Sequence, residues 1–159
     1  MLPDDSHWMT LAIDQARRGI ADGQSPFGAV IVRGGSLVAA GHNEVWRRTD
    51  PTAHAEVVCI QRACEALRTI DLSGSEMYTT TEPCPMCAAA IHWSKLASVH
   101  FGTTIADALH AGFSELTVPI DRLYRDGNSP VRLAQAPRSV RARCAGLFDE
   151  WKAAGGKSY

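Results

Sequence analysis

The sequence of 159 residues contains no long hydrophobic run, no excess of one sign of charge and few cysteines. No apolar stretch approaches the ~20 residues that a membrane helix needs, so we expect no membrane-spanning segment. The first five residues include no basic side chain and no apolar core, so they do not resemble a secretory signal. The net charge of −1 argues against the strongly basic balance of nucleic-acid-binding domains. These absences favour a cytoplasmic protein without a membrane or nucleic-acid partner.

Five cysteines do not form the dense pattern of a disulfide-stabilised secreted domain, and they fit a reducing compartment. Cys59 and Cys64 are five residues apart, which places them about 140° apart around a helix. They cannot both face one metal ion without distortion. We therefore interpret both as small apolar packing residues.

Hydrophobic residues make up 45% of the sequence and charged residues 21%, which is ordinary for a globular protein. The length corresponds to a single domain covering residues 1–159, without internal repeats or linkers. Apolar segments on either side of Gly34-Gly35 predict a β-hairpin. Further along the chain, strands alternate with helices. This order predicts a three-layer α/β/α architecture with a mixed central sheet of about five strands, the later ones parallel.

The periodicity of apolar residues gives approximate bounds for each element. The expected helices cover about 6–22, 52–67, 85–95, 105–111 and 140–154. The expected strands cover 29–32, 37–40, 77–80, 98–102 and 131–133.

Two short motifs about thirty residues apart contain the side chains best suited to chemistry. The first is His54-Ala55-Glu56, and the second is Pro83-Cys84-Pro85-Met86-Cys87. One histidine and two cysteines supply three ligands, the number that a catalytic zinc takes when its fourth position stays open for water. Glu56 is not needed as a ligand, so it is available as an acid and base beside the metal. Zinc follows from the types of ligand.

The spacing within each motif predicts where the metal lies. Cys84 and Cys87 are three residues apart and share one face of a helix, and Pro85 is favourable at the first helical position. His54 and Glu56 are about 200° apart around an ideal helix. They can share one site only if the metal lies at the start of their helix rather than along its side.

Two other interpretations of the motifs remain open at this point. A Cys-x-x-Cys pair is often a redox pair, and a zinc site can be purely structural. Neither has a use for Glu56 beside the ligands. The combination of His, Glu, the cysteine pair and its preceding proline is much more specific than any of its parts, and it matches a known signature of nucleobase deaminases.

The residues 50–57 and 81–87 that contain these motifs resemble the cytidine deaminase-like superfamily, and the likeness extends over nearly the whole chain. They are similar to the purine branch, which contains bacterial guanine deaminases and tRNA wobble-adenosine deaminases. Ala111-Gly112-Phe113, followed by Glu115, resembles the guanine deaminases most, and so does the ending Lys157-Ser158-Tyr159. The resemblance implies a homodimer. In that group the C-terminal segment, here about 137–159, is exchanged between subunits, and the last tyrosine closes the partner's active site.

The resemblance also implies a set of residues that bind the substrate: Asn43, Glu115, Phe27, Trp93, Ala55 and Tyr159. Asn43 matches an asparagine that reads the substrate. Glu115 stands where the group usually has aspartate, a side chain one methylene shorter. Phe27 and Trp93 match positions that line the pocket.

We therefore expect zinc-dependent hydrolysis of a purine, with guanine converted to xanthine and ammonia. Zinc held by His54, Cys84 and Cys87 would make a water acidic, and Glu56 would transfer its protons. The alternatives are a guanosine or other purine nucleoside deaminase and a tRNA wobble-adenosine deaminase. From a different class, the chain could be a structural zinc or redox module.

Overall fold

The computed structural model describes the backbone of residues 3–159 and the side chains of residues 5–159. The helices are α1 (Pro3–Ala21), α2 (Val45–Arg48), α3 (Ala55–Leu67), α4 (Pro85–Trp93), α5 (Ile105–Ala111), α6 (Ile120–Asp126) and α7 (Arg138–Ala153). The strands are β1 (Gly28–Arg33), β2 (Ser36–His42), β3 (Ser75–Thr81), β4 (Ser98–Thr103) and β5 (Arg132–Gln135).

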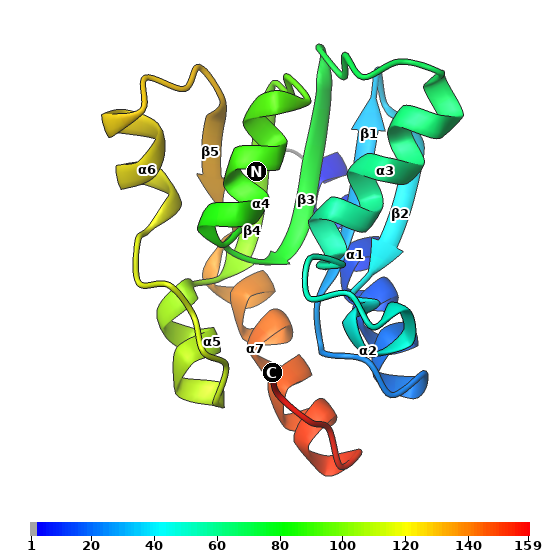
Figure 1. Cartoon of the computed structure of the whole chain (residues 1–159), viewed down its shortest axis with the longest axis vertical. Helices are drawn as coiled ribbons and strands as arrows, with labels where there is room; N and C mark the ends of the chain where they lie inside the picture. The colour runs from blue at the N-terminus through cyan, green and yellow to red at the C-terminus, as the bar shows by residue number, and fades with distance from the viewer. Residues whose placement is uncertain (1–2) are drawn as a thin grey trace.

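The five strands form one mixed sheet in the order β2-β1-β3-β4-β5. β1 pairs antiparallel with both β2 and β3, whereas β3, β4 and β5 run parallel to one another. Helices α3 and α4 cover one face of the sheet, and α1 and α7 cover the other (Figure 1). The predicted three-layer α/β/α fold is therefore confirmed, including the parallel later strands.

The hydrophobic core has one part on each face of the sheet, because alternate residues of a strand point to opposite sides. Ile31 and Met77 pack beneath α3 and α4, while Val30 and Tyr78 pack beneath α1 and α7. Helix α1 approaches the sheet so closely that a Cβ atom on Gly28 would lie 2.1 Å from the carbonyl oxygen of Ala12. Glycine is required there for the helix to pack directly on the strand.

The hairpin turn is as expected, since Gly34 and Gly35 both have positive φ values of 56° and 74°. The helix that contains the end of the first motif begins at Ala55, three residues later than the predicted start at residue 52. The side chain of Asp50 instead accepts hydrogen bonds from Thr52 and stabilises a turn before the helix. No helix among residues 3–159 is both long and apolar enough to cross a membrane.

Candidate metal centre and active site

Several segments that are distant in sequence end at the same edge of the sheet. β2 leads to Asn43, β3 leads to Cys84, and the chain enters β1 at Phe27. Helix α3 starts at this edge, with His54 as its N-cap residue. Ligand sites in open α/β sheets commonly lie outside the carboxyl ends of the parallel strands, and the two sequence motifs meet there.

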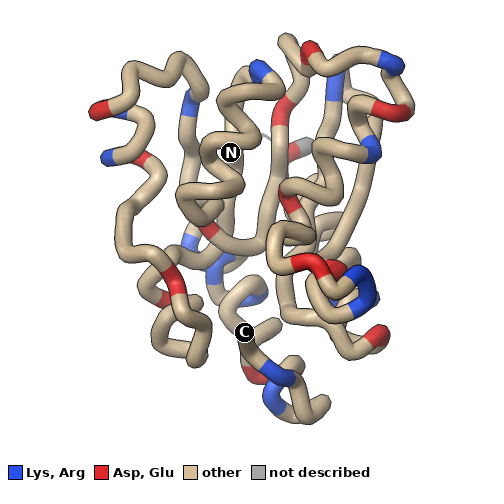
Figure 2. Tube along the Cα trace, viewed as in Figure 1, with Lys and Arg blue, Asp and Glu red and all other residues tan. Residues whose placement is uncertain are grey.

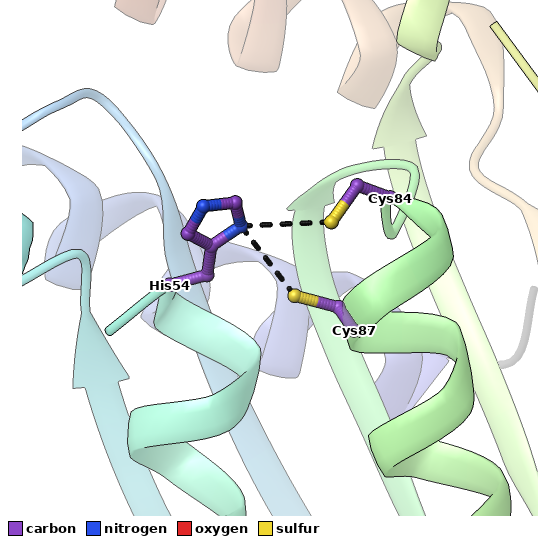
Figure 3. A group of neighbouring side chains, drawn as sticks. All are labelled: His54, Cys84 and Cys87. Atoms are coloured by element: carbon purple, nitrogen blue, oxygen red, sulfur yellow. Dashed lines mark hydrogen bonds between the residues drawn. The ribbon is translucent and has the colours of Figure 1, made fainter. Parts of the chain in front are cut away.

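His54, Cys84 and Cys87 form a compact cluster of potential ligands (Figure 3). Nδ1 of His54 lies 3.6 Å from each cysteine sulfur, and the three ligand atoms all lie within 4.8 Å of one another. A tetrahedral ion with bonds of about 2.0 Å to nitrogen and about 2.3 Å to sulfur separates such atoms by roughly 3.5–3.8 Å. The residues therefore fit a zinc ion in both geometry and chemical type.

The two helix starts create this cluster. Cys84 is the N-cap of α4 and Pro85 is its first residue, as the sequence predicted, while Cys87 lies in the first turn. His54 caps α3, and its imidazole points across to the sulfurs of α4 (Figure 3). The metal position thus lies at the start of both helices, which is the arrangement that allows His54 and Glu56 to share one site.

Glu56 is buried in the first turn of α3, with its Oε2 3.6 Å from the sulfur of Cys87. The hydroxyl of Thr79, on β3, lies 3.4 Å from Oε1 of Glu56 and 3.3 Å from the carbonyl oxygen of Thr81, and its single proton can be donated to either acceptor. One carboxylate oxygen thus lies beside the sheet while the other faces the ligand cluster. Burial, and then the nearby charge of Cys84, raises the pKa of Glu56 to about 7. Such a group can both accept and donate a proton near neutral pH.

The ligand thiols differ in acidity. A hydrogen bond from Cys87, with a further one from His54, lowers the pKa of Cys84 to about 4. The pKa of Cys87 is raised, because Cys87 is the donor to Cys84 and is also buried. Burial opposes protonation of His54, but the hydrogen bond with Cys84 and the charge of Glu56 raise its pKa overall. The cluster holds one thiolate ready for a metal cation.

A cavity of about 280 Å³ opens beside the cluster, at the lower limit for small-molecule pockets. Its wall includes His54, Cys84, Phe113, Glu115 and Tyr159. A smaller inner cavity connects the metal ligands to Phe27, Glu56 and Glu115. Burial, and then the charge of Cys84, raises the pKa of Glu115. The space beside the metal position is thus bounded by aromatic rings and one carboxyl group.

Asn43 lies at the end of β2 with no exposed surface. Its Oδ1 accepts a hydrogen bond from the backbone N–H of Val45, and its Nδ2 donates one of 2.6 Å to the hydroxyl of Tyr159. Tyr159 belongs to the same chain, and its ring lies 5.8 Å from that of His54. The C-terminal residue therefore covers the metal cluster on one side.

The structure brings most of the substrate-binding residues implied by the resemblance to one place. Phe27 packs edge-on against Phe113 with ring centroids 4.9 Å apart, and Ala55 is fully buried between His54 and Glu56. Trp93 is the exception, and its expected place in the pocket is not observed in this chain. It is the last residue of α4 and 81% exposed, roughly 13 Å along the helix axis from Cys84.

Two buried carboxylates near the site were not singled out from the sequence. Glu44 follows Asn43 and forms ion pairs with Arg48 and Arg62 at 2.5 and 2.6 Å. Glu82 precedes the cysteine motif and accepts hydrogen bonds from backbone groups. Only their positions, each next to a site residue, could have drawn attention to them, because glutamate is usually exposed.

Comparison with known proteins identifies the class of protein that this fold and cluster define. Residues 2–103 match the family described as the cytidine and deoxycytidylate deaminase zinc-binding region. The chain belongs to this family and is a zinc-dependent aminohydrolase. The non-enzymatic interpretation of the motifs is thereby excluded.

Individual relatives come from the purine branch. The chain is 44% identical to the guanine deaminase of Bacillus subtilis over 107 residues, which are 67% of each protein. It is 40% identical to the tRNA-specific adenosine deaminase of Aquifex aeolicus over 106 residues, 67% of this chain and 69% of that protein.

Solved structures extend the similarity to the whole chain. A guanine deaminase from Nitrosomonas europaea has a TM-score of 0.84 at 28% identity, covering 95% of this chain and 85% of that one. A structure in complex with 2,6-diaminopurine has a TM-score of 0.87 at 28% identity, covering 100% and 86%. The expected cytidine deaminase-like fold is confirmed by these neighbours.

Proposed function

We propose that this protein hydrolyses guanine to xanthine and ammonia. The observation that carries the proposal is the placement of Glu115 in the wall of both cavities beside the metal cluster. Asn43 is buried behind Tyr159, which lines the outer cavity and to which its amide is hydrogen-bonded. The similarity to the Bacillus subtilis guanine deaminase, over the segment that contains both motifs, supports the same substrate. The structural neighbour with bound 2,6-diaminopurine supports a small purine ligand.

In this proposal His54, Cys84 and Cys87 hold one zinc ion per chain. When bound, zinc supplies an acidified water at neutral pH. Glu56 takes a proton from the attacking water with the oxygen that faces the cluster, and passes it to a ring nitrogen of the base. As the water oxygen bonds to the amine-bearing carbon, the second proton remains on that oxygen. Glu56 would then take this proton and give it to the amino group, so that the C–N bond breaks, ammonia leaves and the carbonyl of the product forms. Thr79 lies 3.4 Å from the other oxygen and can donate a hydrogen bond to it.

Recognition of the base is assigned to Asn43 and Glu115. A purine carries both donors and acceptors on its edges, and the amide and the carboxylate complement them. Because Glu115 is partly buried in the cavity wall, an unmatched edge would leave a polar group without a partner. Sites of this kind reject analogues lacking the matching group by about 10⁴. Phe27 and Phe113 contribute flat apolar walls.

A free base fits the site better than a polynucleotide does. The hydrogen bond between Tyr159 and Asn43 draws the C-terminus over the cavity, which leaves limited space for a nucleic-acid strand. Lys and Arg are interspersed with Asp and Glu along the chain rather than gathered on one side (Figure 2). A tRNA enzyme needs a surface that neutralises phosphates. These features favour guanine over the wobble adenosine.

The test is ammonia release by the zinc-loaded protein from guanine, adenine, cytosine, guanosine and tRNA. We expect guanine to be turned over with the highest kcat/KM. Preferential turnover of guanosine would show that the preferred substrate is the nucleoside rather than the free base. Turnover of tRNA that weakens steeply as salt increases would establish the wobble-adenosine alternative and contradict this proposal.

We further propose that the chain forms homodimers in the cytoplasm. All five cysteines are free, which suits a reducing compartment. Helix α4 contains no Lys, Arg, Asp or Glu and ends with the exposed Trp93, which supports its contact with a second copy. Exchange of segment 137–159 between subunits stays a prediction. Light scattering tests whether the protein is a dimer. We expect Trp93→Ala to weaken the dimer, and Ile70→Ala, at another exposed position, is the control.

A further inference from the structure

Glu82 is a buried carboxylate that contacts neither the metal ligands nor a cation in the described part of the chain. It lies between the end of β3 and Cys84, and it is 8% exposed. Its own backbone N–H donates to the carbonyl of Thr103 at 2.7 Å, which continues the pairing of β3 with β4 by one residue. The side chain points into the protein, where a charged group requires several hydrogen bonds.

The two oxygens of Glu82 accept hydrogen bonds from the first residues of two different helices. Oε2 accepts from the N–H of Ile105 at 3.0 Å, and Oε1 accepts from the N–H of Ile120 at 2.8 Å. The first N–H groups of a helix have no partner within the helix. Ile105 and Ile120 are buried, so water does not satisfy these groups. One carboxylate therefore connects the starts of α5 and α6.

The loop between these two helices contains Glu115. Residues 112–119 run from the end of α5 to the start of α6. The N–H groups of residues 114–118 donate to no other described backbone group. Phe113 is buried against Phe27 and Trp151, but Leu116 at the tip is 68% exposed. The position of the loop thus depends on its two ends and on the packing of Phe113.

Glu82 and Glu115 line the same small inner cavity, together with His54 and Glu56. Two carboxyl groups in one cavity repel each other when both are charged, and Glu82 contributes to the raised pKa of Glu115. The hydrogen bonds to Ile105 and Ile120 engage both oxygens of Glu82. Glu115 is left as the carboxyl group available to a base.

We infer that Glu82 is a positioning residue that sets the distance between Glu115 and the metal ligands, through its hydrogen bonds to Ile105 and Ile120. It joins directly to the cysteine motif on one side. On the other side it binds Ile120, where the Glu115 loop ends, and Ile105, the first residue of the helix that leads into this loop. This inference rests on the proposed function of Glu115 in reading the purine edge. It adds that purine affinity depends on a residue that does not touch the purine.

The decisive variant is Glu82→Gln. A glutamine has one acceptor oxygen and one NH2 donor. The backbone N–H of either Ile105 or Ile120 therefore loses its acceptor and lies opposite the NH2 group, which is also a donor. We expect KM for guanine to increase about tenfold or more, because hydrogen bonds to charged groups are among the strong ones. We expect zinc content to stay at one per chain. Glu65→Gln is the matched control on an exposed helix face and should leave KM unchanged.

A double-mutant cycle separates positioning from a general loss of stability. If Glu82 acts through Glu115, then Glu82→Gln should change KM much less in a Glu115→Gln background than in the wild type. A purely structural role would lower the active fraction and the melting temperature in both backgrounds and leave KM unchanged. Equal effects on KM in both backgrounds, or no effect in either, would overturn the inference. If Glu82→Gln does not fold, Glu82→Asp retains both oxygens and is expected to give a smaller increase in KM.

Failure of the proposed function would look different. In that case the wild type releases no ammonia from guanine, and the cycle cannot be read from guanine kinetics. Amide exchange measured by NMR then tests the inference without a substrate. We expect Glu82→Gln, and not Glu65→Gln, to accelerate exchange at Ile105 or Ile120. Unchanged exchange at both residues would overturn it.

Discussion

The side-chain amide of Asn43, a residue with no exposed surface, donates a 2.6 Å hydrogen bond to the hydroxyl of Tyr159. The pair joins the end of β2 to the last residue of the chain, 116 positions later. It places an aromatic ring beside His54 at the mouth of the proposed substrate site. Tyr159 is thus a part of the pocket.

The first prediction concerns this hydrogen bond. Tyr159→Phe keeps the ring but leaves Nδ2 of the buried Asn43 without its partner, which costs about 1–3 kcal/mol. We expect kcat/KM for guanine to fall by about 5- to 160-fold, with zinc content unchanged. Steady-state kinetics on the zinc-loaded variant measures this. An unaltered kcat/KM would mean that the tyrosine hydroxyl has no part in the site.

The second prediction concerns the path of the C-terminal tail. A Cβ atom on Gly156 would lie 2.0 Å from Nε1 of the buried Trp151. Because the indole is packed in the core, the tail must move instead. Gly156→Ala should therefore reduce guanine turnover at least as much as Tyr159→Phe does.

Gly146→Ala is the matched control for the tail variant. A Cβ atom at Gly146, within α7, meets no atom within 4 Å. Alanine is favoured over glycine in a helix by about 0.5–1 kcal/mol. We expect this variant to be slightly more stable and fully active. Equal activity of both glycine variants would show that the tail does not depend on passing close to Trp151.

The third prediction concerns Glu44, the buried carboxylate next to Asn43. Its partners Arg48 and Arg62 are partly exposed, with side-chain accessibilities of 37% and 41%, so the solvent screens part of their attraction. Glu44→Gln should lower the free energy of unfolding by about 1–3 kcal/mol. Urea denaturation measures the change, with Glu65→Gln as the exposed control. A loss no greater than that of the control would contradict this account of Glu44.

The fourth prediction concerns the zinc-free protein. With its pKa lowered to about 4, the thiol of Cys84 is ionised at pH 6, whereas burial raises the pKa of Cys64 and raises that of Cys144 to about 12. Since the thiolate is the reactive form, iodoacetamide at pH 6 should modify Cys84 first. Added zinc should protect it. Mass spectrometry identifies the modified residue, and earlier modification of Cys64 would contradict the assignment.

Much of the fold follows from local sequence patterns. The hairpin at Gly34-Gly35 and the alternation of strands and helices predicted the mixed sheet and its layers. The spacing of His54 and Glu56 predicted a metal position at a helix start, and the structure places both residues there. These features depend on contacts within a few residues, which a sequence displays directly.

The features that could not be predicted depend on long-range contacts. Tryptophan is a residue type that usually lies in a core or a pocket. Trp93 is nevertheless exposed, at the end of its helix far from the metal ligands. Nothing in the local sequence distinguishes Glu82 from an exposed glutamate, because its partners at the starts of α5 and α6 are distant in the sequence. Helix α2 was not predicted for a different reason. It is only four residues long, which is too short to show a periodic pattern of apolar residues.

The most direct test of the account compares the wild type with Glu56→Gln, measuring zinc per chain and ammonia release from guanine together. Removing the group that transfers protons should lower kcat by about 10² to 10⁴, while His54, Cys84 and Cys87 still bind one zinc ion per chain. A zinc-loaded Glu56→Gln variant with near-normal turnover would contradict the central claim that this carboxylate, beside the three-ligand metal position, carries the chemistry.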